Sequence, residues 1–268
     1  MATGWVIAHP DGAGWLCQII AASGETEVVA GLSPAQAASL LTDGPRIGLV
    51  LGHDEAPLVA LPCDPVAALR GAVAVDDGAA WRVLPRFSQE SPLMLSAGEE
   101  VLLVGALSIA PKFDGAMLIR GQARALWAQI SAGEVVSILG SIAPDLRRQL
   151  APQLPPGVVV ADAAFLQALA ETLSRPERLS AHLAALPALR RLRGADEGQI
   201  RASVAGWLLG AELAAARPWW LGQQVLLITD QDDGASAALK EQGITPHHLP
   251  MQAALMAGLQ AIAPLNAA

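Results

Sequence analysis

The sequence has no tyrosine, three phenylalanines and only two cysteines among its 268 residues. Cys17 and Cys63 are too few for a disulfide framework, and no ligand-type neighbours give either of them a metal-binding spacing. His182 and the histidine pair at 247–248 also lack nearby acidic or cysteine partners. These scarcities predict a chain that has no metal site of its own and stays reduced in the cytoplasm.

Basic residues are scarce too, because 17 Lys and Arg face 25 Asp and Glu and leave a formal net charge of -8. A chain with this charge has no general field that would attract nucleic acid, so we predict no nucleic-acid partner. An anionic ligand would need a local basic patch. The candidates for such a patch lie close together in mid-chain: Arg120, Arg124, Arg147 and Arg148.

Long apolar runs are missing as well, although 53% of the residues are hydrophobic. The richest run, 204–216, is interrupted by Glu212 and is too short to cross a bilayer. The first residues lack the basic region and long apolar stretch of a secretory signal. We therefore predict a globular chain with a large buried core and no membrane partner.

The patterns that are present alternate between strand and helix. Apolar runs on either side of HPDGAG predict an N-terminal β-hairpin, a buried strand is expected at 47–52, and 98–110 has the acidic first turn of a helix. A similar order recurs from residue 115, with three strand-like runs and a helix that begins at Asp145. Because the recurrence is coarse, it indicates two related α/β lobes without a residue-level repeat.

Three apolar segments carry a resemblance to a known family: AGEEVLLVGAL at 97–107, VAGWLLGAELAAARP at 204–218 and AALMAGLQAIA at 253–263. In order and spacing they resemble landmarks of the 2-dehydro-3-deoxygalactonokinases, and the resemblance covers nearly the full chain. It implies an α/β fold of two ribonuclease H-like domains of the actin, Hsp70 and sugar-kinase type, at residues 1–105 and 106–268, with a central cleft. It also implies ATP-dependent phosphoryl transfer to a hydroxyl of 2-dehydro-3-deoxygalactonate, with ATP and Mg²⁺ as cofactors.

The N-terminal hairpin turn is where the family carries Asp-Trp-Gly-Ser-Thr. In this chain the carboxylate position falls on His9 and the hydroxyl position on Ala13, which cannot donate a hydrogen bond. The resemblance makes Asp11 the candidate catalytic residue here, with Gly12 and Gly14 as candidate phosphate-binding residues. The same residues also suit an ordinary hairpin turn.

The family's Arg-Gly-Glu-Glu landmark is kept here as Gly98, Glu99 and Glu100, without the arginine. The resemblance makes the two glutamates candidate substrate-binding residues, although two acids in a first helical turn are also typical of a helix start. A shortened sugar-acid segment leaves His53 and Asp54 as further substrate-binding candidates. A solvated loop would explain these two side chains equally well.

A third landmark, Pro-Gly-Thr-His-x-Lys-Trp, aligns with Arg120, Gly121 and Arg124, which become candidate phosphate-binding residues. A fourth, Met-Thr-Gly-Glu-Leu, leaves Asp145 as a second candidate catalytic residue, although an acid beside a proline also makes a good helix start. The loop at 229–234, small and rich in Gly and Ser in the family, holds three aspartates here. Those charges would repel a triphosphate.

Three functional hypotheses stay open from the sequence. The chain is an active sugar-acid kinase with substitute residues, or it is a pseudokinase that binds a sugar acid or a protein partner without turnover. A third hypothesis is a structural or oligomerisation role, as in a homodimer, which the exposed-looking Trp219–Trp220 pair supports, although buried packing is the commoner use of tryptophan.

Overall fold

A computed structural model describes residues 4–11, 14–21, 23, 25–33, 36, 39–40, 46–74, 81–150, 161–231 and 233–266. The chain forms two compact units, Met1–Ile109 with Leu255–Ala268, and Ala110–Ala254. The sequence-based division at 105/106 places the C-terminal helix in the second domain, whereas the contacts place residues from Leu255 onward in the first unit. In the described residues, no helix has both the length and the apolar character needed to cross a membrane.

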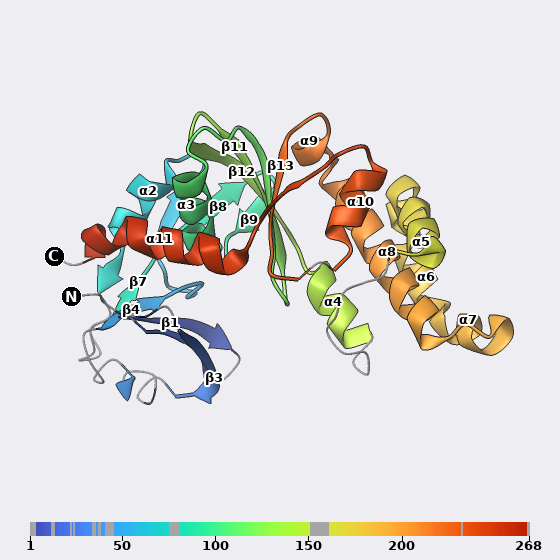
Figure 1. Ribbon diagram of the computed structural model, residues 1–268, viewed down its shortest axis with the longest axis horizontal. Helices are drawn as coiled ribbons and strands as arrows, with labels where there is room; N and C mark the ends of the chain where they lie inside the picture. Colours follow the sequence, from blue (N-terminus) through green and yellow to red (C-terminus); the bar gives the residue numbers. More distant parts are fainter. Residues whose placement is uncertain are drawn as a thin grey trace. The chain divides into compact units, whose positions relative to one another are not determined.

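The first unit is built on a six-stranded sheet with the order β3-β2-β1-β4-β7-β6 (Figure 1). The predicted N-terminal hairpin is confirmed, since β1 and β2 pair antiparallel, while β1, β4 and β7 run parallel. A second, three-stranded sheet, in the order β5-β8-β9, was not predicted from the sequence. The strand bounds are β1 Gly4–Asp11, β2 Gly14–Ile20, β3 Thr26–Leu32, β4 Arg46–Val50, β5 Leu58–Ala60, β6 Val73–Ala74, β7 Trp81–Val83, β8 Arg86–Glu90 and β9 Leu93–Leu95.

Helices α3 (Glu100–Ile109) and α11 (Met251–Asn266) pack together in the first unit, beside the short α2 (Pro65–Ala68) and η1 (Leu69–Gly71). Val101 of α3 and Leu259 of α11 are both fully buried in one core cluster. Gly258 allows the contact, because a side-chain carbon there would overlap the carbonyl oxygen of Val101. Two of the family-like segments are therefore packed against each other.

The second unit repeats the topology of the first, with a five-stranded sheet in the order β12-β11-β10-β13-β14. The first three strands pair antiparallel, and β10, β13 and β14 run parallel. The strands are β10 Gly115–Arg120, β11 Ala125–Ser131, β12 Glu134–Ser141, β13 Val225–Ile228 and β14 His247–Leu249. The helices are α4 Ala143–Leu150, α5 Ala163–Ser174, η2 Pro176–Arg178, α6 Leu179–Ala184, α7 Leu186–Arg193, α8 Glu197–Ala215, α9 Arg217–Trp220 and α10 Ala235–Glu241.

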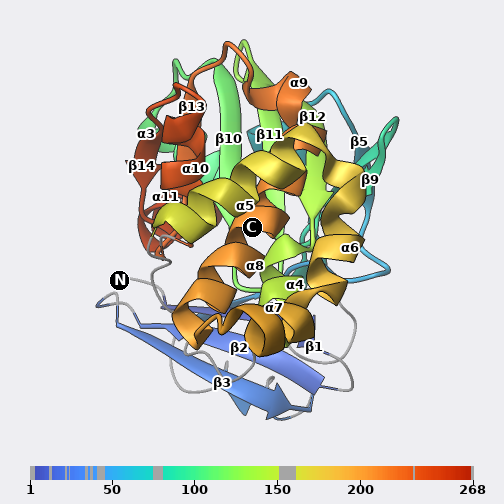
Figure 2. The ribbon, with the colours of Figure 1, turned by 90° about the vertical axis from the view of Figure 1, so that its right-hand side faces the viewer.

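Helix α8 is the centre of the second unit and lies along α5 (Figure 2). Its Asp196–Gln199 capping box defines the first turn. Gly206 and Gly210 bring it into backbone contact with α5, because a side-chain carbon at either position would overlap α5 atoms. The third family-like segment is thus also a packing element.

The tryptophan pair after α8 is not the exposed contact that the sequence suggested. Trp220 is 2% exposed, and its indole nitrogen donates to the carbonyl oxygen of Leu213 at 2.8 Å. Trp219 is partly buried against the same core. The prediction of an exposed pair was wrong, because both rings complete the core under α9, and the pair no longer supports a homodimer.

Candidate functional site

Three segments of the first unit meet where the parallel strands β1 and β4 end: the end of β1, the loop that follows β4, and the loop that precedes α3. The Leu51 N–H donates to the carbonyl oxygen of Ala8 at 3.0 Å, which continues the β1–β4 pairing beyond the strands. A side-chain carbon at Gly98 would lie 3.0 Å from Cε1 of His9, and one at Gly52 would lie 3.0 Å from the carbonyl oxygen of Ala97. Both glycines have positive φ, +109° and +68°, so only glycine fits these approaches. In open α/β sheets, ligands bind outside the carboxyl ends of the parallel strands, which is where these segments meet.

Arg86 at the start of β8 connects two of these segments. Its Nε donates to the carbonyl oxygen of Ser96 at 2.6 Å. Its Nη1 lies 3.4 Å from Oδ1 of Asp54 and 3.5 Å from the carbonyl oxygen of His53. Since N–H···O bonds are usually about 2.7–3.2 Å, the guanidinium is held firmly on the Ser96 side and weakly on the other. The Asp54 side chain is fully exposed, so its contact is open to exchange.

The two glutamates at the start of α3 are buried, with Glu99 9% and Glu100 1% exposed. Burial above all, and then the neighbouring charge of Glu99, raises the pKa of Glu100 to about 7. The hydroxyl of Ser96 donates to Glu100 and accepts from the N–H of Phe87 at 2.7 Å. Burial lowers the pKa of His9, so this imidazole is neutral near pH 7. The first unit therefore offers a carboxyl that titrates near neutral pH and a neutral imidazole.

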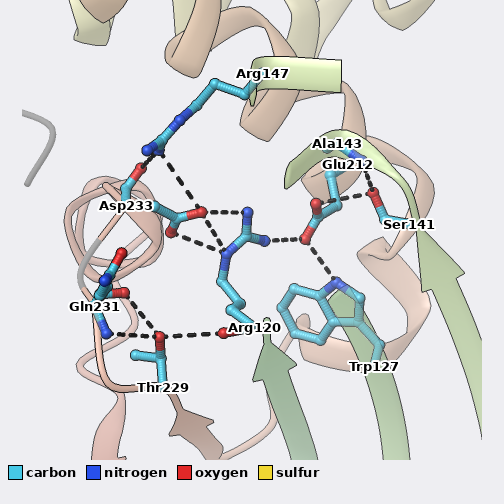
Figure 3. A network of polar contacts seen from close by, with 9 residues as sticks. All are labelled: Arg120, Trp127, Ser141, Ala143, Arg147, Glu212, Thr229, Gln231 and Asp233. Carbon is cyan, nitrogen blue, oxygen red and sulfur yellow. Dashed lines mark hydrogen bonds and ion pairs between the residues drawn. The ribbon is translucent and has the colours of Figure 1, made fainter. Parts of the chain in front are cut away.

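The second unit has a polar cluster at the equivalent strand edge, where Arg120 ends β10 (Figure 3). The Nε of Arg120 lies 2.9 Å from both oxygens of Asp233, and its Nη2 lies 2.7 Å from Oδ2. Its Nη1 donates to Glu212 of α8 at 2.6 Å. Arg120 is 5% exposed, so this is a buried arginine shared by two carboxylates.

Glu212 is satisfied from three directions. Besides Arg120, it accepts hydrogen bonds from the indole nitrogen of Trp127 at 3.3 Å and from the hydroxyl of Ser141 at 2.9 Å. Burial by itself would lower the pKa of Arg120, but the charges of Asp233 and Glu212 outweigh burial and raise it above its usual value. The guanidinium is therefore permanently charged and already neutralised by protein groups.

A pocket of about 170 Å³ opens beside this cluster and is lined by Arg120, Gly121, Gln122, Thr229, Asp230, Gln231, Asp233 and Met251. The carboxylate of Asp230 accepts from the N–H of Met251 at 2.8 Å, at the start of α11. The hydroxyl of Thr229 donates within its own loop, to the carbonyl oxygen of Gln231 at 2.7 Å. The polar groups of the pocket are thus bonded mainly to one another.

Comparison with known protein families identifies the family of the chain. Residues 25–262 match the model of the family described as 2-keto-3-deoxy-galactonokinase. This chain belongs to that family. The resemblance read from the three apolar segments is thereby confirmed. Among curated proteins, no sequence matches the chain.

Solved structures agree with membership of the 2-keto-3-deoxy-galactonokinase family. A Sinorhizobium meliloti protein assigned as a 2-dehydro-3-deoxygalactonokinase is similar with a TM-score of 0.79 and 22% identity, over 97% of this chain and 95% of that one. The activator of 2-hydroxyisocaproyl-CoA dehydratase from Clostridium difficile, with bound ADPNP, is similar with a TM-score of 0.51 and 11% identity, over 100% and 96%. At these identities the likeness shows the fold, and it confirms the expected pair of ribonuclease H-like domains.

Within the family's N-terminal landmark, the described residues reach only part of the predicted site. Strand β1 ends at Asp11, which pairs with Gly14 at the start of β2, and Gly12 lies outside the described residues. Of the remaining candidates of the first unit, His53, Asp54 and Glu99 belong to the two loops that Arg86 connects, and Glu100 begins α3 directly after the second loop. The first unit therefore gathers the predicted substrate-binding residues in one region.

The predicted site residues of the second unit form hydrogen bonds and ion pairs with other groups of the protein. The N–H of Gly121 donates to the carbonyl oxygen of Arg124 at 2.9 Å, in the turn between β10 and β11. The carboxylate of Asp145 accepts from Arg148 and from Gln149 on its own helix, each at 2.6 Å. The expected mid-chain basic patch is therefore largely paired with carboxylates.

Sequence reasoning missed Arg86, Ser96 and Glu212 as site residues. Glu212 carried the clearest signal, because a single acid within an apolar helix needs a buried partner. Arg86 and Ser96 carried none, since an arginine and a serine near short strands are ordinary surface residues. Only their contacts show that both are buried.

Proposed function

We propose that this member of the 2-keto-3-deoxy-galactonokinase family binds a 2-dehydro-3-deoxy sugar acid and has little or no ATP-dependent kinase activity. 2-Dehydro-3-deoxygalactonate is the first candidate ligand, because it is the substrate that the family's description implies. The observation that carries the loss of kinase activity is the pairing of Arg120 with Asp233 and Glu212. The guanidinium N–H groups of Arg120 already donate to these two carboxylates.

Sugar-acid binding is assigned to the first unit. Arg86 has the fork geometry that matches a carboxylate, and its long contact to the exposed Asp54 is one that a ligand carboxylate can replace. Glu99 and His53 lie in the adjoining loops and supply polar groups for sugar hydroxyls. The raised pKa of Glu100 makes ligand binding sensitive to pH near 7.

The second unit does not fit the phosphates of ATP with Mg²⁺. Arg120 is already neutralised, and Asp230 and Asp233 line the same pocket, where they would repel a triphosphate. The family's hydroxyl position at the N-terminal turn is Ala13, which has no donor. Loss of one preorganised charge-stabilising group typically slows catalysis about 10²- to 10³-fold, so several losses together leave little activity.

A second candidate function is an active sugar-acid kinase that uses ATP and Mg²⁺. Family membership and the kept Gly98, Glu99 and Glu100 favour it. On this hypothesis Asp11 or Asp145 supplies the catalytic carboxylate. The ion pair and hydrogen bond that hold Asp145 on its own helix would then have to break.

Thermal unfolding of the purified chain with each ligand separates these functions, because a ligand that binds only the folded state raises the unfolding temperature. We expect a rise with 2-dehydro-3-deoxygalactonate, no rise with Mg-ATP, and ADP release at the background rate. Sugar-acid-dependent release of ADP would establish the kinase instead. No response to any 2-dehydro-3-deoxy sugar acid would refute the binding half of the proposal.

Arg86→Lys tests the assigned carboxylate contact, because lysine keeps the charge and loses the fork. Hydrogen bonds to charged groups contribute about 1.5–3 kcal/mol, so we expect the dissociation constant for the sugar acid to rise about 10- to 100-fold. Arg70→Lys is the control, since Arg70 is exposed in the same unit. Equal affinities of the two variants, measured by calorimetry, would show that Arg86 does not hold the ligand.

A further inference from the structure

We infer that the helical part of the second unit contains a binding pocket for a small zwitterionic ligand, which has a primary amine at one end, a carboxylate at the other and an apolar body between them. The pocket has a volume of about 510 Å³ and lies among α5, α6, α7 and α8 (Figure 2). Its described lining residues all belong to the second unit and lie outside the cluster around Arg120. The inference therefore goes beyond the proposed function and does not depend on it.

The walls of this pocket are mostly apolar. Small side chains on α5 and α7 leave the space open, and leucines of α7 border it: Ala164, Ala168, Ala188, Leu189 and Leu192. Leu192 is 81% exposed, so the apolar surface continues to the rim. Small-molecule sites are typically about 300–1,000 Å³, with apolar walls and a few polar groups that orient the ligand. The apolar body of a small ligand therefore suits this space.

The negative end of the pocket is the carboxylate of Glu171, which is held in a fixed position on α5. The indole nitrogen of Trp207 donates to its Oε2 at 2.8 Å, and the amide nitrogen of Gln167 donates to its Oε1 at 3.0 Å. Burial raises the pKa of Glu171, but these hydrogen bonds, with a smaller effect of the His182 charge, outweigh burial and lower the pKa below its usual value. The carboxylate is therefore ionised at pH 7.

The charge of Glu171 lacks a permanent partner. Among the described residues, its one ion-pair contact is with Nδ1 of His182 at 3.7 Å, and an imidazole is charged only when it is protonated. An ionised carboxylate accepts about four hydrogen bonds, so about two acceptor positions remain beside those that Trp207 and Gln167 use. The Glu171 side chain is 35% exposed and lines the pocket. A ligand ammonium group would supply both the missing charge and the missing donors.

The aromatic wall beside Glu171 also suits a cation. The rings of His182 and Trp207 are stacked, with 5.0 Å between their centroids and 19° between their planes, and both residues line the pocket. The stack holds the indole in the position from which it donates to Glu171. Aromatic rings attract cations, and the attraction is greatest for tryptophan.

The positive end of the pocket is Arg193, the last residue of α7. Within the described part of the chain, Arg190 of the same helix pairs with Glu197, whereas Arg193 takes part in no ion pair. A guanidinium would repel a simple amine, but its fork matches a carboxylate. Because Glu171 and Arg193 line the same pocket from different helices, a ligand with both an amine and a carboxylate satisfies the two charges together.

The inference is tested with 6-aminohexanoate, which has both charged ends on a methylene chain. Hexylamine and hexanoate are the matched probes that keep only the amine or only the carboxylate. Binding to the full chain is followed by ligand-observed NMR, which detects weak complexes, and dissociation constants are obtained by titration at constant ionic strength. We expect 6-aminohexanoate to bind, and each single-charge probe to have a dissociation constant about 10-fold higher or more.

Glu171→Gln tests the amine contact, because glutamine still offers an oxygen to the Trp207 N–H and loses only the charge. We expect the dissociation constant of 6-aminohexanoate to rise about 10- to 100-fold. Glu177→Gln is the control, since Glu177 is exposed in the same helical region and does not line the pocket. A purely structural role of Glu171 would lower the unfolding temperature of Glu171→Gln and leave probe binding unchanged, which would overturn the inference.

Arg193→Gln tests the carboxylate contact, with the exposed Arg191→Gln as its control. Arg193→Gln should weaken 6-aminohexanoate about 10-fold and should not weaken hexylamine. If hexylamine binds the wild type as tightly as 6-aminohexanoate does, the assigned carboxylate contact is wrong.

Ala188→Phe fills the pocket without changing any charge, and we expect it to abolish binding of the probe. This variant decides the question if Glu171→Gln cannot be recovered in folded form, since unchanged binding to Ala188→Phe would place the probe elsewhere on the protein. Absence of 6-aminohexanoate binding to the wild type would also overturn the inference. None of these results bears on sugar-acid binding, which is assigned to the first unit and measured with a different ligand.

Discussion

Replacing Gly210 by alanine tests whether the family-like segment of α8 is kept for packing. A side-chain carbon at this position would overlap the carbonyl oxygen of Leu169 and the hydroxyl of Thr172, and would lie 3.0 Å from the N–H nitrogen of Leu173. Backbone atoms of a helix cannot turn aside. The Thr172 hydroxyl is also engaged, since it donates to the carbonyl oxygen of Trp207 at 2.7 Å. The substitution must therefore push α5 and α8 apart.

The expected loss of stability follows from opposing effects. Alanine in a helix interior is favoured over glycine by about 1 kcal/mol. Overpacking a tight contact costs about 1–3 kcal/mol, and loss of the Thr172 hydrogen bond about 1 kcal/mol more. The net destabilisation is then about 1–3 kcal/mol, which corresponds to a fall of about 2–12 °C in unfolding temperature.

Urea and thermal unfolding of Gly210→Ala measure this loss, with Gly198→Ala as the control. Gly198 is in the exposed first turn of the same helix, where the nearest atom to a new side-chain carbon is the Asp196 carboxylate oxygen at 3.1 Å. We expect the control to match or exceed wild-type stability. If Gly210→Ala were as stable as Gly198→Ala, close α5–α8 packing could not be the reason for this glycine.

Three further predictions concern single side chains. Glu100 has a pKa raised to about 7 from 4.5, so the folded chain holds this proton more tightly than the unfolded chain. The contribution of Glu100 to stability is therefore greatest below pH 4.5 and is lost as the pH rises to 7, so the wild type should lose about 3 kcal/mol relative to Glu100→Gln over this range. Parallel pH profiles of the two proteins would contradict this. Glu212→Gln leaves Arg120 short of a buried partner, and urea unfolding should show a loss of about 3–5 kcal/mol; a loss below 1 kcal/mol would mean that Asp233 alone suffices. Asp196→Ala removes the α8 capping box and should cost about 1 kcal/mol in the same assay, whereas an unchanged value would assign the helix start to packing alone.

The strongest local patterns were predicted well. The hairpin of β1 and β2 follows from two apolar runs around a Pro- and Gly-rich turn, and α3 follows from an acidic first turn before an apolar run. Strand β3 and the sheet β5-β8-β9 were missed. Most side chains of β3 are exposed, so this strand lacks an alternating apolar pattern. Strands β5 and β9 have three residues each, which is too short to show one.

The glycines of the family-like segments show where sequence resemblance and physics meet. Gly206, Gly210 and Gly258 each sit where another helix leaves no room for a side chain. These positions serve the packing of the fold, whereas the candidate phosphate-binding residues lie in turns outside these segments. This explains why the resemblance indicated the fold more securely than the activity.

By itself, the sequence determined the family, the repeated α/β pattern and the candidate positions at the strand ends, because local propensity and apolar spacing act over a few neighbouring residues. Only the tertiary structure decided which ion-pair partners those positions have and how deeply they are buried. Arg120 was identified as a phosphate-binding candidate, but its partners Glu212 and Asp233 lie 92 and 113 residues away along the chain. Ion pairs and burial depend on distance in space, so only the folded chain shows that this arginine is already neutralised.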